Sequence, residues 1–301
     1  MSSAILAGIE MGGTKCVCTL GCGPHDIRAQ SVLPTRDPDS TLLAIAQVLE
    51  QWNATLGAFA AVGVACFGPV DLRRGSRTYG RIGSTPKALW THVDLPDFFC
   101  RRFAVPIGFS TDVIGAALAE GRWGAARGLA DYAYVTVGTG VGVGLIVAGG
   151  PLLACHHPEL GHARIVRARG DTWPGHCAFH GDCVEGLASG PAIEARSGQA
   201  AAGLPVDSPV WGSVAHALGQ LAHILVVSVA PQRILIGGGV LGAQPHLLPR
   251  IRTALNSSLN GYLDFEELRA GERYIDAPGL GTNAGPLGAL AVAADALAGA
   301  L

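Results

Sequence analysis

The sequence is poor in lysine and nearly balanced in charge. Only Lys15 and Lys87 among its 21 basic residues are lysines, and the formal net charge is −2. Nucleic acids and anionic membranes attract proteins with a basic excess, so neither is expected as a partner. A zinc-dependent nucleic-acid-binding protein is disfavoured for the same reason. Because arginine is the usual cation of this chain, each lysine is a candidate for a specific chemical role.

A secretory signal is also missing from the sequence. The N-terminal residues MSSAILAGIEMGG contain no basic region before the apolar stretch, so we expect a cytoplasmic protein whose eight cysteines are reduced. One uncharged stretch, 132–155, is long enough to cross a bilayer. Its glycines alternate from 138 to 144, which favours a strand, a turn and a strand over a membrane helix.

Residues 155–186 concentrate histidine, cysteine and glutamate. Cys177, His180 and Cys183 follow one another at intervals of three, a spacing that allows them to bind one metal ion. Thiolate and imidazole are the ligands that Zn²⁺ prefers, and a structural zinc site has four. His162 is the favoured fourth ligand, with alternatives in His156, His157 and His176. A loop that carries histidines without binding a metal is the other interpretation.

Two glutamates flank this candidate metal site. Glu159 precedes His162 by three residues, and Glu185 follows Cys183 by two. A bound zinc would hold both carboxylates in place, and fixed carboxylates beside an imidazole can bind the hydroxyls of a sugar. The alternative is that both are ordinary solvated surface residues.

The sequence also contains two glycine hairpins. Strand-like residues 5–11 and 16–20 flank the turn Gly12-Gly13-Thr14-Lys15, whose amides, hydroxyl and ammonium can bind a phosphate. Residues 135–142 repeat this pattern around Gly138-Thr139-Gly140. Either hairpin alone could be a simple strand connection. Together they predict a duplicated nucleotide-binding core with the nucleotide between its halves.

Three other strand ends carry candidate site residues. A strand over 60–67 ends at Gly68-Pro69, where α/β sheets usually bind ligands, and 73–87 is then expected to form two short strands and a lid-like loop. Asp112 follows a strand at 106–110 and precedes a helix at 113–123, so it is either a general base or the N-cap. Gly237-Gly238-Gly239 ends a strand at 233–237, either beside an adenosine or in a tight turn. Helices are predicted at 40–57, within 191–230 and at 286–297.

In this order, the motifs GGTK, Thr111-Asp112, VGTGVGVG, ELGH, CAFHGDCVE and GGGV resemble those of the sugar kinases of the ROK family along essentially the whole chain. Within that family the fructokinase branch is the most similar, on the residues Glu10, Thr85-Pro86-Lys87, Thr111 and His180. The resemblance implies an α/β fold of the actin-like ATPase (ribonuclease H-like) type, usually as a homodimer. It also implies two lobes around a cleft, the first formed by 1–112 and completed by 286–301, the second by 113–285.

The resemblance implies a role for each motif residue. Asp112 would be the catalytic base, and Mg²⁺ would bridge the phosphates of ATP with Glu10 as its partner. The sugar would contact Gly68, Thr85, Lys87, Thr111, Asp112, Glu159, His162 and Glu185. ATP would contact Glu10, Gly12, Gly13, Thr14, Lys15, Gly138, Thr139, Gly140, Gly238 and Gly239. Structural Zn²⁺ would be bound by His162, Cys177, His180 and Cys183.

The expected reaction is transfer of the γ-phosphoryl group of ATP to the 6-hydroxyl of D-fructose. A mannokinase or glucokinase of the same family is the alternative enzyme, and a sugar-sensing regulator without catalysis is the alternative from another class. The regulator is disfavoured because the first hairpin begins within the first dozen residues, which leaves no room for a DNA-recognition helix before it. One departure from the family pattern is Ile114, where relatives often carry a polar residue.

Overall fold

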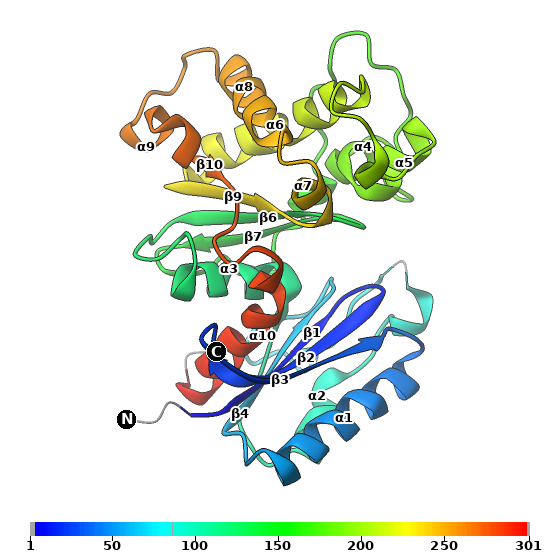
Figure 1. Ribbon diagram of the computed structural model, residues 1–301, viewed down its shortest axis with the longest axis vertical. Helices are drawn as coiled ribbons and strands as arrows, with labels where there is room; N and C mark the ends of the chain where they lie inside the picture. Colours follow the sequence, from blue (N-terminus) through cyan, green and yellow to red (C-terminus); the bar gives the residue numbers. More distant parts are fainter. Residues whose placement is uncertain (1–3, 86, 300–301) are drawn as a thin grey trace. The chain divides into compact units, whose positions relative to one another are not determined.

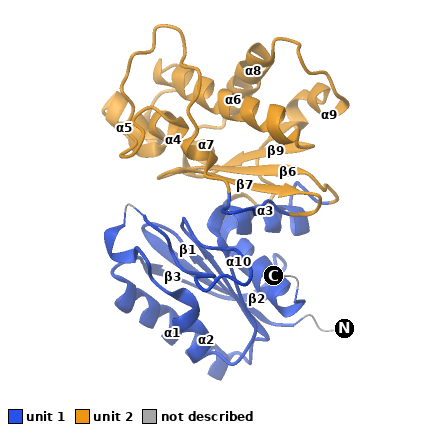
Figure 2. Cartoon of the chain, turned by 180° about the vertical axis from the view of Figure 1, so that it is seen from behind, with its two compact units in different colours: residues 1–127, 151–157, 282–301 blue, residues 128–150, 158–281 orange. Residues whose placement is uncertain are grey.

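The computed structural model describes residues 4–85 and 87–299, which form two compact α/β units (Figures 1 and 2). The first unit contains 1–127, 151–157 and 282–301, and the second contains 128–150 and 158–281. Residues 113–127, which the predicted boundary assigns to the second lobe, belong to the first unit. The reason is that helix α3 (Asp112–Trp123) packs along the final helix, α10 (Ala284–Leu297).

The first unit is a five-stranded sheet with helices on both faces. Its strands are β1 (Leu6–Met11), β2 (Lys15–Gly23), β3 (Asp26–Pro34), β4 (Ala61–Cys66) and β5 (Ile107–Thr111), in the order β3-β2-β1-β4-β5. Strand β1 is antiparallel to β2 and parallel to β4, which is parallel to β5. The remaining elements are α1 (Pro38–Thr55), α2 (Leu95–Arg102) and the short 3-10 helix η1 (Ala88–Trp90).

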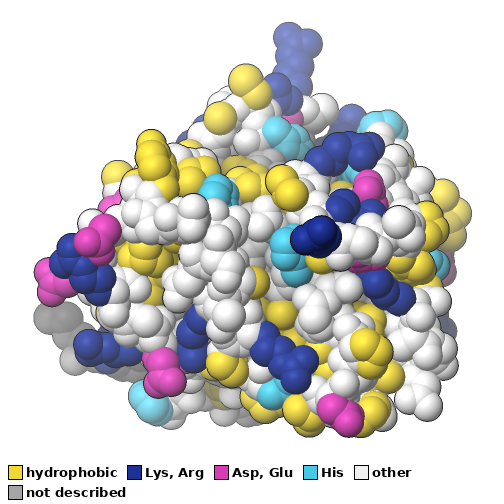
Figure 3. Space-filling view, turned by 90° about the horizontal axis from the view of Figure 1, so that it is seen from above, with side chains coloured by type: hydrophobic (Ala, Val, Ile, Leu, Met, Phe, Trp, Pro, Cys, Tyr) yellow, Lys and Arg dark blue, Asp and Glu magenta, His cyan; other side chains and the backbone are white. Residues whose placement is uncertain are grey.

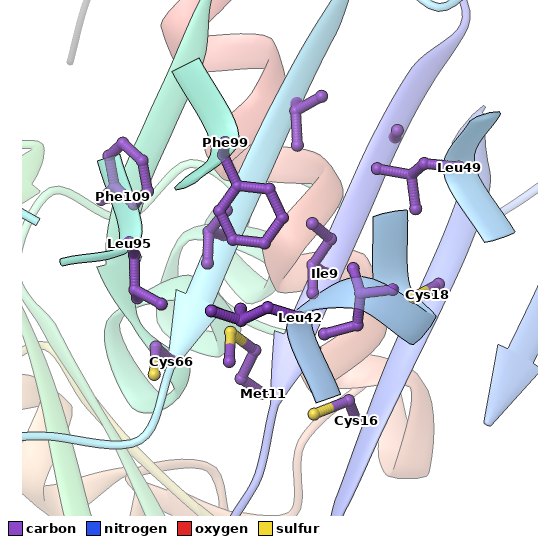
Figure 4. Close-up of a cluster of buried hydrophobic side chains, with 14 of the residues drawn as sticks. Ile9, Met11, Cys16, Cys18, Leu42, Leu49, Cys66, Leu95, Phe99 and Phe109 are labelled. Carbon is purple, nitrogen blue, oxygen red and sulfur yellow. The ribbon is translucent and has the colours of Figure 1, made fainter. Parts of the chain in front are cut away.

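The alternation of side chains along β1 gives the two faces of this sheet different partners. Ile9 and Met11 point into an apolar cluster under α1 and α2 (Figure 4). On the opposite face, Gly8 of β1 pairs with Gly63 of β4, and α10 lies directly over both. A Cβ atom on Gly8 would lie 2.8 Å from the backbone nitrogen of Leu290. The absence of side chains therefore allows the close contact between helix and sheet.

The second unit repeats this strand arrangement. Its strands are β6 (Tyr132–Val137), β7 (Val141–Val147), β8 (Gly150–Pro151), β9 (Arg233–Gly237) and β10 (Ile275–Asp276), in the order β10-β9-β6-β7-β8. Strand β6 is antiparallel to β7 and parallel to β9, which is parallel to β10. These pairings match those of the first unit, as the predicted duplication requires. Its helical elements are η2 (Leu160–His162), α4 (Val184–Ala188), α5 (Gly190–Ser197), η3 (Ala201–Gly203), α6 (Val210–Val229), α7 (Gly239–Ala243), α8 (Leu247–Leu259), α9 (Glu266–Arg269) and η4 (Gly271–Arg273), and η5 (Gly281–Asn283) leads into α10.

Helix α6 is the one helix among the described residues that is long and apolar enough to cross a membrane. Half of its apolar window is buried within the second unit, where it packs against α4 and α8. Core helices of globular proteins pass the same test, so this helix is weak evidence for a membrane span. The uncharged stretch at 132–155 forms β6, β7 and β8, as its glycine pattern predicts.

The structure corrects the prediction for residues 73–87. Instead of two short strands, the described residues of this segment form turns, with isolated bridges between Val70 and Ile82 and between Arg81 and Asp94. The Asp71 carboxylate organises the turns, because it accepts hydrogen bonds from Arg73 and Thr78, at 2.9 and 2.6 Å. The Arg73 guanidinium holds the pKa of Asp71 well below its usual range.

Candidate functional site

The first glycine hairpin joins β1 to β2 in a tight, braced turn. The amide of Gly12 donates to the carbonyl of Lys15 at 2.9 Å, which closes the turn. Thr35, just after β3, holds it from the side: its amide donates to Thr14 O at 3.0 Å, and its hydroxyl donates to Gly12 O at 2.8 Å. The turn is therefore pre-shaped, as a phosphate-binding backbone loop must be.

Two carboxylates belong to this hairpin region. Burial, and secondarily the charge of Asp112, raise the pKa of Glu10 to about 7, although Lys15 opposes the shift. The Glu10 carboxylate lies against the first turn of α10, where a Cβ atom on Gly285 would overlap it. A carboxylate that is shielded from water and has a second carboxylate nearby is suited to bind a hard divalent cation such as Mg²⁺. The charge of the cation would stabilise the ionised carboxylate in place of a bound proton. No local sequence signal marks Gly285, because its role depends on a contact with the distant residue Glu10.

The structure bears on one of the two interpretations of Asp112, that of the N-cap. Thr111, not Asp112, is the N-cap of α3, because its Oγ1 accepts a hydrogen bond from Ile114 N at 3.2 Å. Asp112 is the first helical residue, and its Oδ1 accepts from Val113 N at 2.9 Å. The carboxylate of Asp112 therefore lies at the N-terminal end of α3. Thr111, predicted to contact the sugar, is 1% exposed and serves as the cap.

Both lysines of the chain lie at the first hairpin. Lys15 begins β2, and a Cβ atom on Gly13 would lie 3.4 Å from Cε of Lys87. The Lys87 ammonium also lies 6.0 Å from the centre of the Phe67 ring, an arrangement that favours a cation. The loop that carries Lys87 is anchored by Trp90, whose indole nitrogen donates to Arg36 O at 2.9 Å. Lys87, predicted to contact the sugar, is thus placed beside a predicted phosphate loop.

The other predicted sugar residues of the first unit lie near the end of β4. Gly68 and Pro69 follow that strand, and Pro69 O accepts a hydrogen bond from Gly83 N at 2.7 Å. Thr85 is half-buried, and its Oγ1 lies 3.5 Å from the amide of Lys87. Pro86 lies outside the described residues.

The second hairpin, between β6 and β7, has a similar backbone and a different environment. The amide of Gly138 donates to Gly140 O at 2.9 Å, and Gly138 O accepts from the amide of Gly190 at the start of α5, at 2.7 Å. On its other side, Val141 N donates to Oε2 of Glu185 at 3.0 Å. A Cβ atom on Gly140 would lie 2.6 Å from the same oxygen. Glycine at 140 therefore makes room for the Glu185 carboxylate.

The four predicted zinc ligands come together in the second unit. One donor atom from each of His162, Cys177, His180 and Cys183 lies within 4.8 Å of the others. Nδ1 of His162 lies 3.6 and 3.7 Å from the sulfurs of Cys177 and Cys183, and Nδ1 of His180 lies 3.7 Å from Cys177 Sγ. Two thiolates and two imidazoles are a complete donor set for tetrahedral zinc.

The chemistry of the cluster fits a cation. Burial, with the neighbouring Cys177 and Glu185, raises the pKa of Cys183 to about 11, although the Gly186 amide opposes the shift. A thiol with this pKa stays protonated at neutral pH unless a metal displaces its proton. The alternative ligands are placed elsewhere: His157 accepts from Val70 N at 3.3 Å in the first unit, next to His156, and the exposed His176 lies outside the cluster.

Two predictions for the second unit have different structural support. Glu159 is exposed and precedes η2, so its carboxylate is accessible to a ligand. Gly238 has φ of 92° and precedes α7, and a Cβ atom there would lie 2.5 Å from Val137 O. The fold alone therefore requires glycine at 238, whatever it binds. Gly239 has open space around its Cα, which leaves room for a ligand.

Comparison with known proteins places this arrangement in a family. Residues 6–296 match the model described as the ROK family. Proteins named fructokinase from Pediococcus pentosaceus and Zymomonas mobilis subsp. mobilis are each 37% identical, covering 97% and 95% of this chain and 99% and 95% of their own lengths. The crystal structure of a ROK hexokinase from Thermus thermophilus superposes with a TM-score of 0.74 at 25% identity, covering 96% of this chain and 98% of that one. The chain belongs to the ROK family, with the actin-like ATPase fold of its sugar kinases.

Proposed function

We propose that this protein is an ATP-dependent fructokinase that phosphorylates the 6-hydroxyl of D-fructose. The observation that carries the proposal is the similarity to named fructokinases along nearly the whole chain. Within the first unit, a carboxylate at a helix start and a braced glycine hairpin supply the groups that phosphoryl transfer requires. The cytoplasmic location and the homodimer stay predictions.

Asp112 acts as the general base. Thr111 fills the capping role of α3, and the Asp112 carboxylate lies at the first helical position, where it accepts a hydrogen bond from Val113 N at 2.9 Å. In the reaction it takes the proton of the sugar hydroxyl as the oxygen attacks the γ-phosphorus. Ile114, where the family resemblance implies a polar residue, is 3% exposed and packs in the core.

The first hairpin binds the charged end of ATP. Its amides and Thr14 position the phosphate oxygens, and Lys15 and Lys87 supply positive charge. This assigns Lys87 to the phosphates and not to the sugar. Mg²⁺ bound with ATP neutralises phosphate charge, and Glu10 is the residue that would hold it, directly or through water.

The hydroxyls at the anomeric end of the sugar, where ketoses and aldoses differ most, form hydrogen bonds with Glu159, His162 and Glu185. Each buried hydroxyl left without a partner costs about 1–3 kcal/mol, so one misplaced hydroxyl is sufficient for tenfold discrimination. Zn²⁺ bound by His162, Cys177, His180 and Cys183 would hold the loop that carries these side chains.

A sugar panel tests the proposed substrate. Values of kcat/KM for fructose, mannose, glucose and N-acetylglucosamine are compared in an ADP-coupled assay, and fructose is expected to lead, followed by mannose. If glucose or the N-acetylated sugar leads instead, the protein is a kinase of another branch. No turnover of ATP with any sugar would contradict catalysis and favour a regulator.

Elemental analysis tests the zinc site. We expect one zinc per chain, and chelation is expected to lower both the thermal stability and the affinity for fructose, because binding energy of the metal stabilises only the folded loop. Active, well-folded protein without any metal other than Mg²⁺ would contradict the assignment.

A further inference from the structure

Glu185 lies between the predicted metal cluster and the second glycine hairpin of the second unit. Its predicted contact with the sugar does not explain this position. The residue belongs to α4, which starts immediately after the ligand Cys183. One of its carboxylate oxygens faces the metal cluster, and the other accepts a hydrogen bond from the second hairpin. The side chain is about one quarter exposed, so part of it stays accessible to a ligand.

The first contact is with the imidazole of His162. The Nδ1 atom of this ring faces the two cysteine sulfurs, and its Nε2 atom lies 3.9 Å from Glu185 Oε1. That distance is too long for a direct hydrogen bond and is one that a bridging hydroxyl or water can span. A metal bound through Nδ1 would leave the proton on Nε2, pointing toward the carboxylate. Through such a bridge, Glu185 would be the outer partner of a metal-binding histidine.

The second contact is with the hairpin backbone. Oε2 of Glu185 accepts from Val141 N at 3.0 Å, directly after the turn at 138–140. This hydrogen bond joins residues 44 positions apart in the sequence. Gly140 permits it, because a Cβ atom at this position would lie 2.6 Å from Oε2. The position of the carboxylate and the position of the hairpin therefore depend on each other.

We propose that Glu185 is a positioning residue that couples the metal centre to the second hairpin, with Gly140 as the residue that makes the coupling possible. The coupling rests on the proposed kinase function, together with the contact of Gly138, Thr139 and Gly140 with ATP that the family resemblance implies. Binding of metal then changes the affinity for nucleotide, and binding of nucleotide changes the affinity for metal by the same factor. A carboxylate that only contacts the sugar would produce no such linkage.

The Gly140→Ala variant breaks the coupling without removing any charged group. The atom that the new methyl group meets is the end of a flexible side chain, so the carboxylate moves away from Val141 N and the fold is preserved. Gly150→Ala is the matched control, since no atom lies within 4 Å of a Cβ there and its φ is not in the left-handed region. Glu185→Gln breaks the coupling differently, because its single amide oxygen can accept from only one of the two partners.

The experiment measures the dissociation constant for Zn²⁺ by competition with a chelator, with and without the non-hydrolysable ATP analogue AMPPNP. In the wild-type protein and in Gly150→Ala, AMPPNP is expected to change this constant at least about fivefold. In Gly140→Ala and Glu185→Gln the factor should fall close to one. Glu185→Gln should also lose about tenfold or more in zinc affinity. Circular dichroism confirms that each variant is folded.

Glu159→Gln separates coupling from sugar contact, since it should weaken fructose binding and keep the zinc–nucleotide linkage. An unchanged linkage in Gly140→Ala and Glu185→Gln overturns the proposal, as does a wild-type protein that binds both ligands independently. Failure of the proposed function gives a different result: the wild-type protein then binds no AMPPNP at all. In that case the coupling is overturned too, and the zinc affinity of Glu185→Gln still reports on the His162 contact.

Discussion

The two glycine hairpins occupy corresponding places in their sheets and have different electrostatic surroundings. Each follows the central strand of a sheet with the same order of strands, and in each the first glycine amide closes the turn. The first hairpin has Glu10 on its strand and both lysines of the chain beside it. The second has no charged residue of its own from β6 to β7, and a carboxylate from a distant helix occupies its flank.

This difference indicates that the two hairpins of the duplicated fold have different binding roles. Cations and a buried carboxylate suit the first hairpin to the highly charged transferring end of ATP. The second hairpin offers backbone amides only, and its Glu185 connects it to the metal cluster. On the face shown in Figure 3, basic side chains are scattered among apolar and acidic ones, so this face carries no continuous basic patch.

The largest change in activity should come from substitution of Asp112, which belongs to the first unit. Asp112→Asn keeps the shape of the side chain and leaves the Thr111 cap intact, but cannot accept a proton. Turnover should fall by roughly 10²- to 10⁴-fold while ATP binding persists. Steady-state kinetics and nucleotide titration measure this, and near-normal turnover would remove Asp112 from the mechanism.

Lys87 tests whether the first hairpin owes its function to charge. A charge-assisted hydrogen bond is worth about 1.5–3 kcal/mol, so Lys87→Met should lower kcat/KM for ATP by roughly 10- to 100-fold. Lys87→Arg keeps the charge and should be less affected, although its guanidinium has a different shape. The KM for fructose is the internal control. A rise in that value alone would return Lys87 to the sugar, as the family resemblance implies.

The two sheets also differ in how closely a helix approaches them. In the first unit α10 lies on Gly8 and Gly63, whereas the corresponding strands of the second unit pair Tyr134 with Leu235. A methyl group on Gly63 would overlap the backbone oxygen of Ala289, so Gly63→Ala should destabilise the protein by about 1–3 kcal/mol. Thermal unfolding measures this against Gly150→Ala. Equal stability of the two variants would show that α10 does not pack closely enough against Gly63 to exclude a methyl group.

The smallest effect concerns the segment of the second unit that carries the predicted zinc ligands, which ion pairs also stabilise. Burial would raise the pKa of Asp171, but hydrogen bonds from Arg196, at 3.0 Å each, and from the Trp173 amide lower it to about 2. Because the pKa of Asp171 is lower in the folded protein, its ionised carboxylate stabilises the fold. This contribution is fully present above pH 3.8, the pKa in the unfolded chain, and is lost as the pH falls through about 2, the pKa in the folded protein. This corresponds to about 2 kcal/mol at neutral pH.

Asp171→Asn should therefore be less stable than the wild-type protein at pH 7 by about that amount, with the difference shrinking below pH 4. Asp264→Asn is the control, because Asp264 and its partner Arg269 are both 64% exposed and such pairs contribute little. Urea unfolding at several pH values gives both differences. A gap between the two variants that is independent of pH would mean that the stabilisation has another origin.

Much of the fold could be predicted because its signals are local. Strands β1 and β2 and helix α10 occur close to the predicted ranges. Strand β3 and helix α2 were not predicted, since β3 is an edge strand that exposes Val32 and Ile27, and α2 is only two turns long. The prediction of two short strands within 73–87 is wrong because the hydrogen bonds around Asp71 compete with strand formation.

The sequence by itself determined the features that arise within a few residues: the glycine turns, and the spacing that brings Cys177, His180 and Cys183 together. Tertiary structure decided the rest. It selected His162 over the other histidines, made Thr111 the cap of α3, and set Glu10 against Gly285 and Glu185 against the second hairpin. The physical reason is distance along the chain. Turns and caps are made by neighbouring residues, whereas these contacts exist only after the order of strands and the packing of helices have brought remote residues together.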